Sequence, residues 1–143
     1  MTEEEIKEVA KPKAEAIIAR EANLDAWYER TKIELERFRY SLEIEEKKVD
    51  KLLEKASAIQ KNIENDGIED QENVNKTIEQ LKYINSRTER FKKKASILLE
   101  KEMILSLVAD VMIEQREQEI SRLQEEAARL QKMLSQVMPD NPS

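Results

Sequence analysis

The apolar positions in the first half of the chain follow a heptad pattern. From Leu24 to Ile63 they recur in alternating steps of four and three residues, with one charged member, Glu45. This spacing is typical of a coiled-coil seam on an α-helix. Proline lacks the N–H that an interior helical turn needs, so Pro12 is expected to start or kink the helix. The pattern therefore predicts a long helix over residues 12–65, after a short leader over residues 1–11.

The second half of the chain is less regular. Apolar positions from Val74 to Met112 form a seam with one short step near Leu81, and the register slips after Met112. Two steps of four through Arg116 then lead to a second clean heptad. Such a slip is a stutter, which locally unwinds a supercoil. We expect a second long helix over residues 71–138 and a tail over residues 139–143.

A turn is expected between the two helices, at residues 66–70. The chain's single glycine, Gly67, suits the positive-φ position that follows a helix C-terminus, and Asp66 or Asp70 can cap the next helix. The sequence therefore predicts one all-α domain over residues 1–143. Its two long antiparallel helices would form a coiled-coil hairpin, with Leu98 near Phe38 and Leu105 near Thr31.

The segment 97–113 is apolar around almost its whole circumference. Twelve of its 17 residues are apolar, and they do not form a single stripe at 100° per residue. A hairpin buries one stripe per helix, so the opposite side needs another cover. Two hairpins meeting in an intermolecular four-helix bundle would provide it. The oligomer interface predicted on this basis comprises Ile33, Tyr40, Ile44, Leu99, Met103 and Leu107.

An alternative within one chain is a monomeric bundle of three or four shorter helices. It requires helix breaks near Tyr40 and near Met103 or Arg116. Neither glycine nor proline stands at any of these positions, and helices usually mark their ends with such residues.

The last heptad segment carries a seam that is more regular than its expected partner. In a straight hairpin it would face residues ahead of about position 20, which offer only the small or sparse apolar groups Ala10, Ala14 and Ile17. We therefore expect it to dock on the same segment of another chain or on a different protein. The residues of this predicted partner interface are Ile120, Leu123, Leu130, Leu134 and Val137.

Composition supports helices and argues against most chemistry. Charged residues make up 39 % and aromatic residues 4 % of the chain, a profile of long helices. Histidine and cysteine are absent and there is one glycine, so Glu-x-x-His dimetal sites, thiolate sites and glycine-rich phosphate loops are not expected. Glu45, Glu102, Glu119 and Arg116 occupy seam positions, where polar residues set register. We expect no enzyme activity, catalytic residue, cofactor or metal.

Charge and hydropathy also limit the partners and the location. The net charge of −6 argues against nucleic acid as a partner. Four charged residues interrupt segment 97–113, which is too short for a membrane span. The basic run from Arg87 to Lys94 could contact phosphates or an acidic membrane surface, but pairing with Glu43, Glu45 and Glu46 is favoured. The acidic N-terminus lacks the features of a secretory signal, and a cytoplasmic or other intracellular location is expected.

Two classes of function follow from these patterns. The first is a structural or adaptor protein that forms a homodimer or higher oligomer and binds a further protein. The second is a protein whose apolar surface is completed by a different protein, such as an export chaperone, effector or ATPase stalk. In shape, two long helices around a central turn resemble the stalk proteins of export ATPases and prefoldin-like subunits. The segment "NLDAWYERTKIELE" resembles the first helix of a spectrin-type repeat, but the loops at each third of such a repeat are missing.

Overall fold

Helices make up almost all of the protein. The computed structural model describes residues 2–67 and 71–137, in which it contains three α-helices and no strand. They are α1 (Glu3–Arg20), α2 (Leu24–Asp66) and α3 (Gln71–Val137). The fold is therefore all-α, as the heptad patterns predict. The expected tail at residues 139–143 lies outside the described residues.

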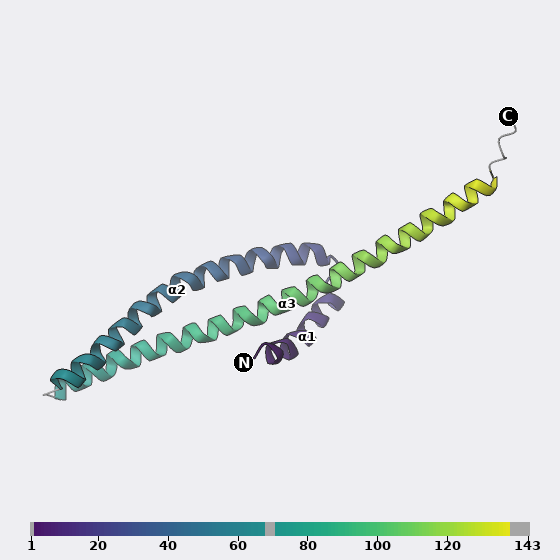
Figure 1. Ribbon diagram of the computed structural model, residues 1–143. Coiled ribbons are helices and arrows are strands. Elements are labelled where there is room, and N and C mark those ends of the chain that lie inside the picture. The colour runs from purple at the N-terminus through teal and green to yellow at the C-terminus, as the bar shows by residue number, and fades with distance from the viewer. Residues whose placement is uncertain (1, 68–70, 138–143) are drawn as a thin grey trace.

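Helices α2 and α3 pack side by side from the turn to the first residues of α2 (Figure 1). Two ion pairs cross this contact. Glu45 Oε2 lies 2.9 Å from Lys94 Nζ, and Glu102 Oε1 lies 2.6 Å from Arg39 Nη2. Between these two pairs, residue numbers rise along α3 as they fall along α2.

The predicted seam of α2 is the side that becomes buried. Leu35, Leu42 and Val49 are buried, and the other seam positions from Leu24 to Ile59 are half-buried. Trp27, one residue before the seam position Tyr28, is also buried. The heptad spacing thus identified the packed side of α2 along most of its length.

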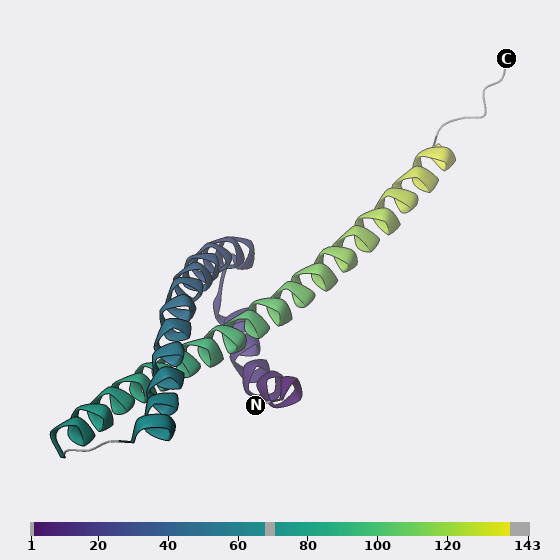
Figure 2. The same ribbon diagram turned by 60° about the vertical axis from the view of Figure 1, so that its left-hand side comes forward.

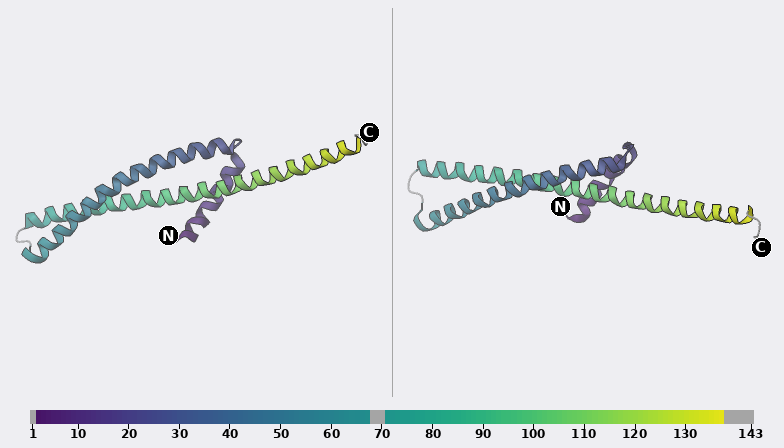
Figure 3. Two further views of the ribbon diagram at one scale, coloured as in Figure 1. Left: turned by 45° about the horizontal axis from the view of Figure 1, so that its top comes forward. Right: turned by 90° about the horizontal axis from the view of Figure 1, so that it is seen from above.

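Helix α1 does not continue the line of α2. The chain turns at residues 21–23, and α1 crosses α3 on the side away from α2 (Figures 1 and 3). The break has clear caps: the Glu21 N–H donates to the Ile17 carbonyl over 2.9 Å, and the Ala26 N–H donates to Asn23 Oδ1 over 3.1 Å. Asparagine is a preferred N-cap residue because its side chain satisfies a free N–H of the first turn.

The predicted N-terminal boundary of the first long helix is therefore wrong. The expected helix over residues 12–65 is divided into α1 and α2, and the expected leader forms the first half of α1. Pro12 lies inside α1 and does not begin it. A proline at this position leaves the Glu8 carbonyl without its usual N–H donor. Both residues are exposed, so water can bond to that carbonyl.

The turn after α2 uses the single glycine as expected. Gly67 has φ +70° and ψ −177°, and its N–H donates to the Ile63 carbonyl over 3.0 Å. This backbone region is essentially restricted to glycine because a Cβ would be strained there. Asp66 is the last residue of α2, whereas Asp70 lies outside the described residues.

The cover of segment 97–113 comes from both other helices. Leu105 and Met112 lie on the side of α3 that faces α2. On another flank, α1 contributes Ala14 to a cluster with Trp27 and Val108, in which Val108 is fully buried. Small residues at a helix crossing allow the two axes to approach closely. We call these three residues, Ala14, Trp27 and Val108, the central cluster.

The monomeric bundle with breaks near Tyr40, Met103 or Arg116 is not the observed arrangement. Helices α2 and α3 are continuous through all three positions, and the break lies at residues 21–23. The C-terminal part of α3 extends beyond both other helices (Figures 1 and 2). In the described part of the chain, no helix is long and apolar enough to cross a membrane.

Candidate functional site

The most conspicuous surface of the molecule is the last part of α3. Every residue from 114 to 137 is exposed, although this segment carries a regular heptad. We call residues 114–137 the arm. Its large apolar seam side chains are between 46 % and 78 % exposed. They are the predicted partner-interface residues Ile120, Leu123, Leu130, Leu134 and Val137.

The arm begins beside the first residues of α2. Asn23 and Leu24, at the start of α2, line a shallow groove together with Met112, Arg116 and Glu119 of α3. Steps of four residues join Met112, Arg116 and Ile120, so the arm seam stays on the side of α3 that faces α2. A straight extension of α2 would have covered this seam. The turn at residues 21–23 sends the chain to another side of α3 instead.

Ile113 extends the arm seam toward the centre, which sequence reasoning missed. It lies seven residues before Ile120 and is 57 % exposed, whereas its neighbour Met112 packs against the central cluster. At the stutter, the apolar stripe of α3 therefore moves by one residue, from Met112 to Ile113. Its sequence signal is the heptad step from position 113 to position 120, in addition to the two steps of four.

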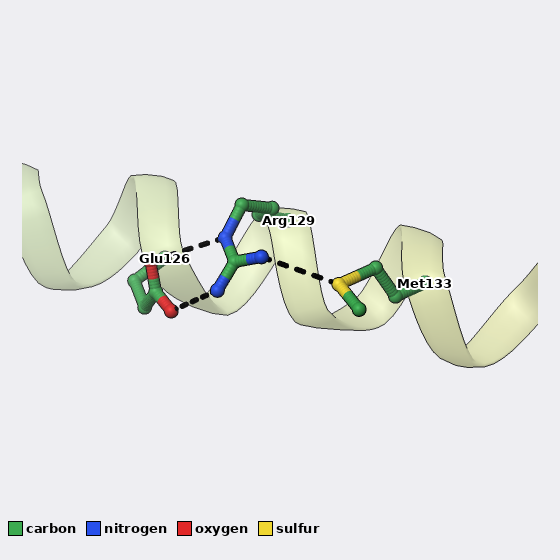
Figure 4. Close-up of polar contacts among 3 residues, drawn as sticks. All are labelled: Glu126, Arg129 and Met133. Atoms are coloured by element: carbon green, nitrogen blue, oxygen red, sulfur yellow. Dashed lines mark hydrogen bonds and ion pairs between the residues drawn. The ribbon is translucent and has the colours of Figure 1, made fainter.

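Arg129 contacts two neighbouring side chains along one edge of the arm seam. Its Nη2 pairs with Glu126, its Nε donates to Glu126 Oε2 over 3.2 Å, and its Nη1 lies 3.2 Å from Met133 Sδ (Figure 4). The bond to the Glu126 carboxylate raises the pKa of Arg129. The glutamate beside the apolar seam is thus already paired within its own helix.

The predicted oligomer interface divides into two groups. Ile33, Tyr40 and Ile44 form an exposed row on α2, which we call the outer row, and Leu99 on α3 is also exposed. Met103 is half-buried, and Leu107 packs against the central cluster. An intramolecular contact therefore covers part of the surface expected to meet a second chain.

Two of the three glutamates at seam positions pair with basic residues across the α2–α3 contact. Glu45 pairs with Lys94 and Glu102 with Arg39. The pKa of Arg39 is raised, mainly by its hydrogen bond to Glu102 and next by the attraction between the two charges. The third, Glu119, is exposed at the start of the arm with Arg116. Both pairs join α2 to α3 at defined positions, as expected of polar seam residues that set the register of two helices.

The basic run from Arg87 to Lys94 is partly engaged within the protein. Lys94 pairs with Glu45 across the helices, and Lys92 pairs with Glu89 within α3. Glu43 and Glu46, the other expected partners, are exposed. Arg87 and Lys94 line one small groove with Lys48 of α2, and within it Lys94 is paired with Glu45.

The rest of the described surface contains shallow grooves near the turn between α2 and α3. The larger groove is lined by residues of both helices, among them Leu52, Ile59, Tyr83 and Ile84. Within residues 2–67 and 71–137, no group of three or more carboxylates is placed to hold a metal ion. The arm carries a longer and more regular row of exposed apolar side chains than these grooves, so it is the strongest candidate for a functional surface.

Comparisons with protein-family models, curated proteins and solved structures give no match to this chain.

Proposed function

We propose that the protein is a non-enzymatic coiled-coil structural or adaptor protein that self-associates and brings proteins together. The single observation that carries this proposal is the arm, a helix segment that has a regular apolar seam although every one of its residues is exposed. An amphipathic helix gains most of its stability from packing its apolar side. An arm of this kind therefore gains stability by packing against another helix.

The remainder of the chain acts as a rigid base in this proposal. Helices α2 and α3 form an antiparallel coiled-coil hairpin, and α1 packs across it at the central cluster. The hairpin holds the arm in a constant direction because α3 is continuous from the base into the arm. Such an arrangement suits a spacer or adaptor, whose partners bind at defined distances.

The outer row favours a second contact between copies. Ile33, Tyr40 and Ile44 on α2 are exposed at the level of the exposed Leu99 on α3. Two hairpins that meet through these residues would form the intermolecular four-helix bundle. Because Leu107 is engaged with the central cluster, this contact is smaller than the arm seam and serves as an additional contact between dimers.

Mass measurement in solution over a concentration series tests self-association. Three proteins are compared: the full chain, a chain ending at Glu117, and an Ile33→Glu/Tyr40→Glu variant. We expect the full chain to form dimers, the shortened chain to lose them, and the outer-row variant to keep them. Circular dichroism of each protein checks that the base remains helical.

The result against the proposal is a full chain that stays monomeric at every concentration. A monomeric chain that gains helical stability only with a different protein would support the second class of function, in which a heterologous partner completes the apolar surface. A dimer that survives loss of the arm but not the outer-row substitutions would place self-association on the outer row.

A further inference from the structure

The arm seam is complementary to itself when two copies run in opposite directions. Its heptad places Ile120, Ala127 and Leu134 at one type of core position and Leu123, Leu130 and Val137 at the other. We propose that the arm pairs with the arm of a second copy as a two-stranded antiparallel coiled coil, with Leu123 of each chain opposite Leu134 of the other. This inference rests on the proposed self-association and specifies its surface, orientation and register.

The first argument concerns the sizes of the seam residues. In the antiparallel register, the small Ala127 faces the larger Leu130 of the second copy, and Ile120 faces Val137. Every seam position from 120 to 137 then has a partner. In a parallel pair, Ala127 would face the same alanine and leave a gap in the middle of the seam. Alternation of large and small side chains across a core gives the closer packing.

The second argument concerns charge. In the proposed register, residues 127–137 of one arm face residues 120–130 of the other. Within this paired span, residues 120–126 carry Arg122, Glu125 and Glu126, whereas residues 127–137 carry Arg129 and Lys132 and no acidic residue. The antiparallel arrangement sets the net acidic part of each arm beside the basic part of the other. A parallel arrangement would set like beside like, which is unfavourable for exposed charges within a Debye length.

The residues flanking the seam do not oppose this arrangement. Glu126 lies opposite Met133 of the second copy and is already paired with Arg129 of its own helix (Figure 4). Gln124 lies opposite Gln131. Antiparallel pairing therefore brings no like charges together along these edges, which are the positions that select coiled-coil partners and orientation.

The third argument concerns room. The first residues of α2, Asn23 and Leu24, lie beside Arg116 and Glu119, on the same side of α3 as the arm seam. In the antiparallel register, Val137 of the second copy lies opposite Ile120, one turn of α3 beyond Arg116. A parallel partner would bring its own α2 and α1 to that same place. A shift of the register by one heptad would set the charged seam residue Arg116 against Leu134 of the second copy.

Cysteine cross-linking tests the orientation because the chain has no cysteine of its own. Leu123→Cys and Leu134→Cys are made separately in the full chain. Each is oxidised alone, and the two are then oxidised as a mixture. In the proposed register, the two different cysteines face each other. Two copies of the same cysteine lie about 16 Å apart along the axis, at 1.5 Å per residue, which is beyond the reach of a disulfide.

We expect the mixture to give at least about tenfold more covalent dimer than either variant alone, given these separations. A mixture of Leu123→Cys with Ala127→Cys is the register control and should not cross-link efficiently. Cross-linking of Leu123→Cys alone would overturn the proposal in favour of a parallel pair. Efficient cross-linking of the register control would overturn the proposed alignment.

Mass measurement of the unmodified chain separates this inference from the proposed function. A chain that dimerises while none of the cysteine samples cross-links self-associates through another surface, and only the arm pairing falls. A chain that is monomeric at every concentration contradicts both.

Discussion

The centre of α3 and the arm are both rich in apolar residues but reach opposite states. Leucine, isoleucine and valine lie on one unbroken helix in both regions, around most of the circumference at residues 97–113 and along one seam in the arm. At the centre, α2 covers one side and α1 another, and Val108 is fully buried. On the arm, Leu134 is 62 % exposed and Val137 78 % exposed.

The difference arises from the path of the N-terminal residues. Had α1 continued the line of α2, it would have run along the arm, and the centre would have kept an uncovered flank. Because the chain turns at residues 21–23, α1 packs against the centre of α3 instead. A heptad pattern therefore shows that one side of a helix is apolar. The path of the chain decides whether that side packs against the same molecule.

The largest expected effect is the loss of the aromatic side chain at the centre. Trp27→Ala should lower the free energy of unfolding by about 3–5 kcal/mol, because a buried side chain is lost and a cavity remains. Urea unfolding at a low protein concentration, followed by circular dichroism, measures the change. Tyr40→Ala, at an exposed aromatic residue of the same helix, is the control and should change stability by about 0.5 kcal/mol or less. Equal effects would contradict the assignment of the centre as the core.

The next test removes the cover that α1 provides. Ala14 is 2 % exposed in contact with α3, so Ala14→Glu should cost at least about 1–3 kcal/mol through overpacking and burial of an unpaired charge, and it should release α1 from α3. Limited proteolysis should then cleave near residues 21–23 faster than in the unmodified protein. Ala16→Glu, which places the same charge on an exposed position of α1, should leave the cleavage rate unchanged. If both variants are equally sensitive, α1 does not depend on this contact.

A smaller effect is expected from the ion pair that aligns α2 and α3. A double-mutant cycle with Glu45→Gln and Lys94→Met should give a coupling of about 0.2–1 kcal/mol, since partly exposed pairs are weak. Raising the salt concentration should reduce the coupling. The exposed pair Glu89–Lys92, which lies within one helix, is the matched comparison and should show no larger coupling. A coupling at Glu45–Lys94 that is indistinguishable from zero would exclude a role in alignment.

The smallest effect is expected on the arm itself. In a dilute monomer, Leu130→Ala should change the unfolding free energy by about 0.5 kcal/mol or less, because this side chain is exposed and no helix among the described residues covers it. Leu35→Ala, the same substitution at a buried seam position of α2, should cost about 2–5 kcal/mol. A large loss from Leu130→Ala under conditions where the protein is monomeric would show that the arm is packed within its own chain.

The sequence alone determined the helical class, most of α2 and α3, and the side on which α2 packs. Heptad spacing identified the seam of α2 from Leu24 to Ile59, and Gly67 marked the turn through its positive φ. Glu45 and Glu102 were recognised as aligning residues, and the structure pairs both across the helices. These features are local, because helical periodicity and the conformational freedom of glycine act over a few residues.

The tertiary structure decided the fate of the first twenty residues and, with it, the cover of Val108. The signal for the break was Asn23, a good N-cap that stands without a neighbouring glycine or proline. The benefit of turning there lies more than eighty residues away, where Ala14 packs against Val108. Periodicity along a chain identifies which side of a helix is apolar, but it does not specify which distant segment covers that side. That choice depends on packing in three dimensions, which left the centre of α3 covered and the arm exposed.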